Sequence, residues 1–204
     1  MLKIGITGGI GSGKTTVCQV FETFGIPVFY ADRAAKAAMT GDETLVTSIK
    51  DHFGAGSYHP DGKLNNQYLA GIVFQEQAAL ETLNSLVHPA VFKAFDKWAE
   101  EWAGHTPYVL KEAALLFESG SYQQCDKNIL VTAPAELRIQ RVMQRDAVTS
   151  DQVRARMDKQ FSDEQKEKMA DYLIYNTEKE SIILQVMALH QKILDLKKEA
   201  DALS

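Results

Sequence analysis

The chain has 204 residues, which is enough for one substantial hydrophobic core and an inserted subdomain. Its net charge of -5 argues against broad binding to nucleic acid or to an anionic membrane surface. Because no apolar run approaches the ~20 residues of a membrane span, and no signal-peptide or disulfide pattern is present, we expect a cytoplasmic protein. We expect it to act as a monomer or weak homo-oligomer, without a nucleic-acid or membrane partner.

A glycine-rich stretch near the start, Gly-Gly-Ile-Gly-Ser-Gly-Lys-Thr-Thr at residues 8–16, fits the phosphate-binding loop pattern G-x-x-x-x-G-K-[ST]. The residues before it predict a buried strand, and those after it have helical apolar spacing. Glycines allow such a loop to point several N–H groups at an anion, and the helix N-terminus adds its positive dipole end. The side chain of Lys14 can reach the β- and γ-phosphates, and the Thr15 hydroxyl can bind Mg²⁺. The motif therefore predicts a nucleoside triphosphate site.

Two carboxylates follow predicted strands. Asp32 comes directly after the strand predicted at residues 28–30, and Glu112 follows the strand predicted at residues 107–110. Ligands of open parallel α/β sheets bind beyond the carboxyl ends of the strands. Asp32 is therefore a candidate to face the γ-phosphate, although a helix N-cap explains it equally well. Glu112 is a candidate to hold Mg²⁺, directly or through water.

Helical patterns fill the region between these carboxylates. Residues 42–53 and 65–103 have helical apolar spacing, and the His88-Pro89 pair is expected to begin the last of these helices. The chain then returns to strands at residues 128–132 and 171–176, and a long amphipathic helix is predicted over residues 179–198. A helical insertion thus interrupts an alternating β-α pattern.

Arginines gather between residues 138 and 156. Arg138, Arg141 and Arg145 follow one another at spacings of three and four on a helix that begins at Pro134, and Arg154 and Arg156 come next. They form either a solvated charged surface or a mobile lid that closes on phosphates, and a negatively charged chain favours the lid.

The ordered motifs resemble those of the dephospho-coenzyme A kinase family within the P-loop kinase superfamily. They are GITGGIGSGKTT (5–16), ADRAAK (31–36), HP (88–89), LLFESG (115–120), RVMQRD (141–146), RMDKQ (156–160) and KMADYLIYN (168–176). The resemblance implies transfer of the γ-phosphoryl group of ATP to the ribose 3′-hydroxyl of dephospho-coenzyme A, with Mg²⁺. This reaction is the last step of coenzyme A biosynthesis.

The expected fold is α/β, with a P-loop three-layer α/β/α core around a five-stranded, mostly parallel sheet. A helical acceptor-binding insertion and a helical lid complete one unit of residues 1–204. The core is assigned to residues 1–40, 105–140 and 168–204, the insertion to 41–104 and the lid to 141–167.

The resemblance also implies roles for individual residues. The predicted catalytic residues are Lys14, Asp32 and Arg141. The predicted ATP contacts are Gly9, Gly11, Ser12, Gly13, Lys14, Thr15, Thr16, Arg145 and Asn176. The predicted acceptor contacts are Asp32, Arg33, His88, Leu116 and Arg156. Thr15 and Glu112 are the predicted metal ligands, and Gln160 falls on the lid motif beside Arg156.

Some positions depart from the family pattern. Lys36 and Glu112 stand where the family usually has Arg and Asp, and Asn66 and Gln67 stand near an expected Arg. These departures concern the acceptor side and the metal, whereas the loop and Asp32 fit the pattern.

Three other functions compete with this one. Another small-molecule kinase, such as a nucleoside monophosphate kinase, would share the loop and the arginine-rich lid. A GTP-binding switch would need an Asn-Lys-x-Asp segment, which the sequence lacks. A nucleotide-sensing module without activity would not need Asp32 or the lid arginines.

Overall fold

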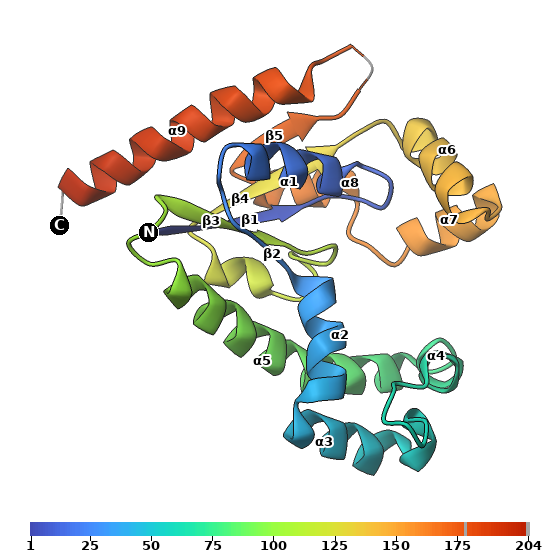
Figure 1. The fold of residues 1–204 in the computed structure, drawn as a ribbon. Coiled ribbons are helices and arrows are strands. Elements are labelled where there is room, and N and C mark those ends of the chain that lie inside the picture. The colour runs from blue at the N-terminus through green and yellow to red at the C-terminus, as the bar shows by residue number, and fades with distance from the viewer. Residues whose placement is uncertain (178, 203–204) are drawn as a thin grey trace. The chain divides into compact units, whose positions relative to one another are not determined.

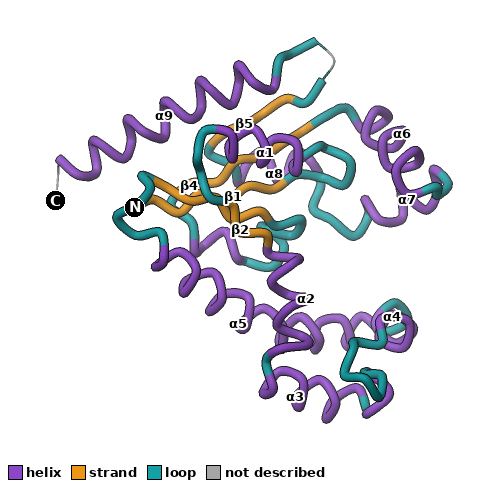
Figure 2. Tube along the Cα trace, viewed as in Figure 1, coloured by secondary structure: helices purple, strands orange, loops and turns teal. Residues whose placement is uncertain are grey.

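The computed structural model describes residues 1–177 and 179–202. Its strands lie side by side in one five-stranded parallel sheet with the order β2-β3-β1-β4-β5 (Figure 2). The strands are β1 (Leu2–Thr7), β2 (Val28–Tyr30), β3 (Tyr108–Glu112), β4 (Lys127–Thr132) and β5 (Tyr172–Tyr175). The predicted α/β fold with a parallel sheet is confirmed.

Helices occupy most of the remaining chain (Figure 1). They are α1 (Lys14–Thr23), α2 (Ala31–Gly41), α3 (Glu43–Phe53), α4 (Asn66–Val73), α5 (Gln77–Glu101), α6 (Ala135–Asp146), α7 (Ser150–Met157), α8 (Asp163–Met169) and α9 (Ile182–Ala202). Two short 3-10 helices are η1 (Ala55–Ser57) and η2 (Ser121–Gln124). Within the described residues, none of these helices has both the length and the apolar character needed to cross a membrane.

The register of the sheet aligns the carboxyl ends of its strands. Ile6 in the central strand lies opposite Glu112 of β3 and Ile129 of β4, and Thr132 lies opposite Tyr175. Because parallel strands end at the same edge, the loop after β1 and the segments after β3, β4 and β5 emerge together. This edge is where the candidate site is built.

The two faces of β1 have different neighbours. Ile4 and Ile6 face a buried apolar cluster that α1 and α9 complete, so both helices lie on this side of the sheet (Figure 1). Gly5 points to the opposite side, where an added Cβ atom would clash with Asn128 and Leu116. On that side α8 packs against β4. The predicted helix–sheet–helix layering follows from this alternation.

The chain divides into two compact units. One contains Met1–Tyr30 and Ala99–Ser204, within which residues 178, 203 and 204 lie outside the described part, and the other contains Ala31–Trp98. The second unit is helical, and two tyrosine hydroxyls fasten its loop: Tyr58 donates to the carbonyl of Met39 at 2.7 Å, and Tyr68 to that of Phe53 at 2.9 Å. The functional division at residues 41 and 105, with a lid at 141–167, stays a prediction.

One predicted helix boundary is wrong. The His88-Pro89 pair was expected to begin a helix, but Pro89 lies inside the continuous helix α5. Proline lacks the N–H that an interior position normally donates, which costs helix stability. Buried side chains on both sides of it, Val87, Val91 and Phe95, hold the helix together across that position.

Candidate active site

The glycine-rich loop connects β1 to α1, as predicted. Gly11 and Gly13 have positive φ angles of 78° and 87°, in the region that favours glycine. The N–H of Ser12 donates to the carbonyl of Gly9 at 3.0 Å, which closes the turn. Helix α1 begins at Lys14, and Thr15 and Thr16 are exposed in its first turn. The loop thus presents a helix N-terminus and two hydroxyls to solvent, the arrangement that binds phosphates.

The Lys14 side chain folds back over this loop. Its Nζ donates to the carbonyl oxygen of Gly8 at 2.9 Å, and the residue is half-buried. The ammonium group is therefore held beside the loop amides, where phosphate oxygens would meet it.

Asn176 and Arg141 support the loop from behind. The Asn176 amide, directly after β5, donates to the carbonyl of Ser12 at 2.8 Å. The guanidinium of Arg141 on α6 donates to the Asn176 carbonyl at 3.3 Å and to its side-chain oxygen at 3.4 Å. A Cβ atom at Gly13 would clash with the Asn176 amide. The structure thus brings together predicted residues from the loop, from α6 and from the position that follows β5.

Arg138 makes a contact that the sequence did not indicate. Its side chain is 4% exposed and forms an ion pair with Asp163 at 2.5 Å. A Cβ atom at Gly9 would clash with its guanidinium, so the glycine is required for this close approach. Only the arginine-rich pattern of the helix pointed to Arg138, and that pattern did not separate it from its neighbours.

Gln160 bridges two segments of the site. Its side-chain oxygen accepts from the backbone N–H of Ile10 in the loop at 3.0 Å, and its amide nitrogen donates to the carbonyl of Ala114 at 3.4 Å. Sequence reasoning placed Gln160 only within a lid motif. No local signal gives its partners, because Ile10 is 150 residues away along the chain.

Glu112 is largely buried at the end of β3. Burial raises the pKa of the Cys18 thiol on α1, Glu112 raises it further, and Lys14 opposes the shift. Glu112 and Lys14 therefore both lie close enough to Cys18 to influence its thiol. Thr15 and Glu112 offer a hydroxyl and a carboxylate, the hard oxygen ligands that Mg²⁺ prefers. Within the described residues no group of three or more acidic, histidine or cysteine side chains could hold a metal. A hydroxyl and a carboxylate suit an ion that takes one or two protein ligands beside substrate phosphates.

The predicted acceptor residues Asp32, Arg33 and His88 belong to the unit of residues 31–98. Asp32 is exposed in the first turn of α2. Since α2 begins one residue earlier, at Ala31, Asp32 lies inside the helix and not at its N-cap position. The ring of His88 stacks on that of Phe92, with centroids 6.0 Å apart.

Two predicted arginines, Arg145 and Arg156, pair with one carboxylate, that of Asp146. Asp146, at the end of α6, accepts from Arg145 at 2.7 Å and from Arg156 at 2.9 Å. Hydrogen bonding to Arg145 lowers the pKa of the Asp146 carboxyl, and the pKa of Arg145 rises in turn. Both pairs are exposed, and the pair with Arg156 joins the end of α6 to α7.

Leu116 does not line an accessible surface. Its side chain is fully buried next to Gly5 on the second face of β1. In this structure it is a core residue, and the predicted contact with the acceptor has no support.

Known proteins match this chain over most of its length. The sequence profile described as "Dephospho-CoA kinase" matches residues 2–181. The dephospho-CoA kinase of Salinibacter ruber is 46% identical over 177 residues, which are 86% of this chain and 89% of the relative.

Two solved structures agree with this result. The crystal structure of TT1252 from Thermus thermophilus has a TM-score of 0.80 at 31% identity and covers 94% of this chain and 96% of that one. The dephospho-CoA kinase from Campylobacter jejuni has a TM-score of 0.70 at 26% identity, with coverage of 95% and 97%. The phosphate-binding loop, the residues that support it and these matches together show that the chain belongs to the dephospho-CoA kinase family.

Proposed function

We propose that the chain transfers the γ-phosphoryl group of ATP to the ribose 3′-hydroxyl of dephospho-coenzyme A and releases coenzyme A and ADP. The observation that carries the proposal is the glycine loop, with Lys14 folded beside it and Asn176 holding the Ser12 carbonyl. This geometry suits a triphosphate donor. The choice of dephospho-coenzyme A as the acceptor rests on membership of the family.

Phosphoryl transfer of this kind depends on positioning and on neutralising charge. The amides of the loop and the ammonium of Lys14 would bind the phosphate oxygens and stabilise the charge that gathers as the bond to ADP breaks. Thr15 and Glu112 would hold Mg²⁺, which supplies further positive charge when bound. Arg141 would add positive charge near the phosphates, since its guanidinium donates to Asn176, which in turn binds the loop.

We assign Asp32 to the attacking hydroxyl. Its carboxylate would orient the 3′-hydroxyl and accept its proton as the new P–O bond forms. Since that proton leaves late in a loose transition state, orientation is the larger part of this role. Arg33 and His88 belong to the same helical unit and are proposed as contacts to the acceptor. Arg145 and Arg156 would join the phosphates only after leaving Asp146.

The proposed setting is the cytoplasm, and the proposed state is a monomer or weak homo-oligomer that acts on a free small molecule without a nucleic-acid partner. The net charge of -5 supports the absence of a nucleic-acid partner. Light scattering after size exclusion would report the state of assembly, and a stable large oligomer would contradict it.

A coupled assay of ADP release tests the acceptor. The purified chain is given ATP and Mg²⁺ with dephospho-coenzyme A, AMP, CMP or UMP in parallel reactions. We expect turnover with dephospho-coenzyme A and only background release with the monophosphates. Turnover with a nucleoside monophosphate alone would assign the chain to a different acceptor.

A further inference from the structure

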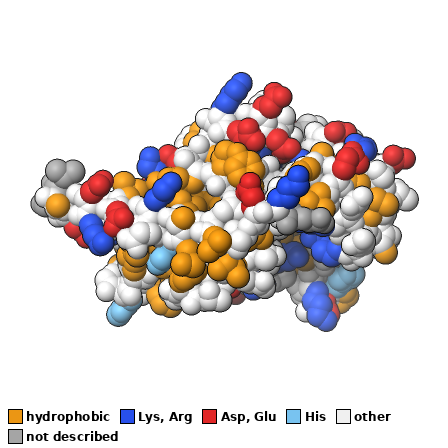
Figure 3. Space-filling view, turned by 90° about the horizontal axis from the view of Figure 1, so that it is seen from above, with side chains coloured by type: hydrophobic (Ala, Val, Ile, Leu, Met, Phe, Trp, Pro, Cys, Tyr) orange, Lys and Arg blue, Asp and Glu red, His pale blue; other side chains and the backbone are white. Residues whose placement is uncertain are grey.

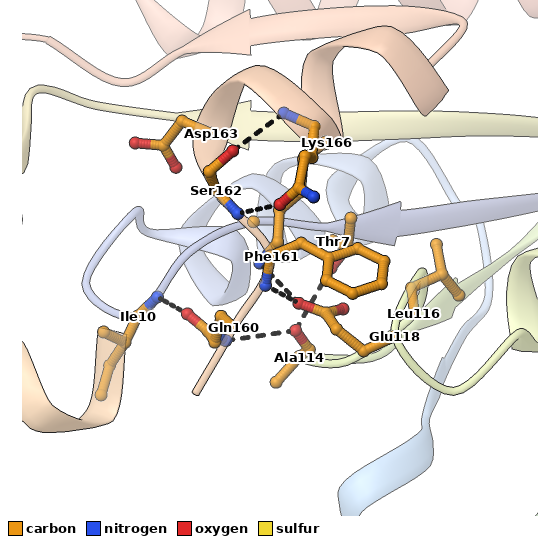
Figure 4. Close-up of polar contacts among 12 residues, drawn as sticks. Thr7, Ile10, Ala114, Leu116, Glu118, Gln160, Phe161, Ser162, Asp163 and Lys166 are labelled. Atoms are coloured by element: carbon orange, nitrogen blue, oxygen red, sulfur yellow. Dashed lines mark hydrogen bonds and ion pairs between the residues drawn. The ribbon is translucent and has the colours of Figure 1, made fainter. Parts of the chain in front are cut away.

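A buried ion pair joins Lys166 to Glu118, close to the segment 160–163 (Figure 4). The Nζ atom of Lys166 on α8 is 3.1 Å from Oε1 of Glu118, which follows β3. The lysine side chain is 0% exposed and that of the glutamate is 12% exposed. Lysine is almost never fully buried without a partner. None of the proposed catalytic steps uses this pair.

Burial of the Lys166 ammonium group is costly. Within the described residues its ammonium makes no aligned hydrogen bond, so the Glu118 carboxylate is its main compensation. Two packed apolar side chains often serve stability at least as well as a buried ion pair. Stability alone therefore does not explain the pair.

The pair also fixes the backbone next to Gln160. The oxygen of Glu118 that faces Lys166 also accepts from the backbone N–H of Phe161 at 2.9 Å. The residue before Phe161 is Gln160, whose side chain reaches Ile10 of the loop and the carbonyl of Ala114 (Figure 4). Lys166 thus contacts Glu118, and Glu118 binds the backbone at Phe161, which positions the Gln160 side chain.

The same segment reaches the loop a second time. Ser162 caps α8 through reciprocal bonds with Gln165, and Asp163 in the next position pairs with Arg138, whose guanidinium packs against Gly9. Residues 160–163 therefore act on the loop at two consecutive positions: Gln160 directly at Ile10, and Asp163 through Arg138 at Gly9. A shift of this segment would move both contacts together.

We propose that Glu118 and Lys166 are positioning residues for the nucleotide site, and that they act through Gln160 on the loop amide of Ile10. The proposal rests on the function proposed above, but the affinity for ADP tests it without any acceptor. Loss of the pair would release the Ile10 N–H and loosen the loop, so the effect falls on the nucleotide and not on dephospho-coenzyme A.

Substitutions on α8 test the pair. We expect Lys166→Met to weaken ADP binding, measured by calorimetry, and to lower kcat/KM for ATP by about 10- to 100-fold, because misplacement by ~1 Å costs about that much. The KM for dephospho-coenzyme A should change less than about two-fold, within the range of an uninvolved contact. Lys166→Arg, which keeps the charge, should restore most of the activity. The matched control is Lys168→Met, an exposed lysine on the same helix, which should behave as wild type.

A double-mutant cycle separates positioning from general packing. If Lys166 acts through Gln160, the variant Gln160→Ala with Lys166→Met should bind ADP no more weakly than Gln160→Ala alone. Independent multiplication of the two effects would overturn the proposal, as would wild-type ADP affinity in folded Lys166→Met. If Lys166→Met does not fold, Gln160→Ala and Glu118→Gln are compared for hydrogen exchange at Ile10. Faster exchange in both supports the proposal, and unchanged exchange in Glu118→Gln contradicts it.

Discussion

At the scale of single residues, the site depends on a few groups held close to the backbone of the loop. Lys14 donates to Gly8, Asn176 donates to Ser12, and Gly13 has a positive φ angle where a side chain would clash with Asn176. Each contact fixes a different part of the loop. Their loss should therefore affect the nucleotide more than the stability of the fold.

Substitution Lys14→Ala removes the ammonium group that meets the phosphates. We expect kcat to fall by about 10² to 10³, the usual cost of losing one preorganised group that stabilises transition-state charge. The residue is only half-buried, so circular dichroism and the melting temperature should stay close to wild type. Near-normal turnover in a folded variant would contradict the assignment of the loop.

Asp32→Asn tests the proposed role at the attacking hydroxyl. The change removes the proton acceptor but keeps the size of the side chain, so kcat should fall by about 10² while ATP affinity is retained. Steady-state kinetics and nucleotide titration give both values. A loss of stability with normal kcat would instead make Asp32 a residue of the α2 terminus only.

At the scale of elements, α9 is attached to the sheet by apolar packing and by polar contacts, one of which involves His190. The Tyr108 hydroxyl on β3 lies 2.7 Å from Nδ1 of His190, and the ring of Phe24 stacks on the same imidazole at 5.2 Å. Burial lowers the pKa of His190, because the charged ring is disfavoured there. Docking of α9 is therefore coupled to pH.

The contribution of His190 to the free energy of unfolding is lost as pH falls. Above the unfolded pKa of about 6.5, His190 is neutral in both states and its contribution to stability is complete. As pH falls, the unfolded chain takes up the proton first, so the free energy of unfolding drops until the lower pKa of the folded state is passed. The free energy of unfolding, measured with denaturant from about pH 8 to about pH 5, should fall more steeply for wild type than for His190→Gln. Parallel pH profiles would contradict this.

Elements were largely predictable because their signals are local. The glycine motif, the apolar strands and the helical spacing each lie within short windows, and parallel β-α pairs allow few topologies. Pro89 was misassigned because its local preference for a helix start lost to burial of neighbouring side chains along α5. The propensity of one residue is a weak guide where packing favours continuity.

The partners of charged residues could not be predicted in the same way. Arg138, Arg141 and Arg145 lie on one helix at spacings of three and four, yet they contact Asp163, Asn176 and Asp146, respectively. The contact between Gln160 and Ile10 joins residues 150 positions apart. Such choices depend on how distant segments pack, which no local pattern contains.

At the scale of the whole molecule, we propose that one compact unit binds the donor ATP and the other provides contacts to the acceptor. Residues 1–30 and 99–204 contain the loop and its supports, and residues 31–98 contain Asp32, Arg33 and His88. The surface seen in Figure 3 carries acidic, basic and hydrophobic side chains interspersed. Ile183, Leu184 and Met187 of α9 are exposed hydrophobic residues.

Nucleotide binding should stabilise the folded chain as a whole. A ligand that binds only the folded state at about 100 times its Kd adds about 2.7 kcal/mol to the free energy of unfolding. We expect ADP with Mg²⁺ to raise the melting temperature of wild type, and to do so far less in Lys14→Ala. Equal shifts in both proteins would place the nucleotide away from the loop.

The position of the transferred phosphate tests the central claim most directly. Wild type is incubated with dephospho-coenzyme A, ATP and Mg²⁺, and the product is separated by chromatography and characterised by mass and ³¹P NMR. The predicted product carries one added phosphate as a ribose 3′-monoester and co-elutes with coenzyme A. A phosphate on another hydroxyl, or an unchanged acceptor beside released ADP, would contradict the proposed reaction.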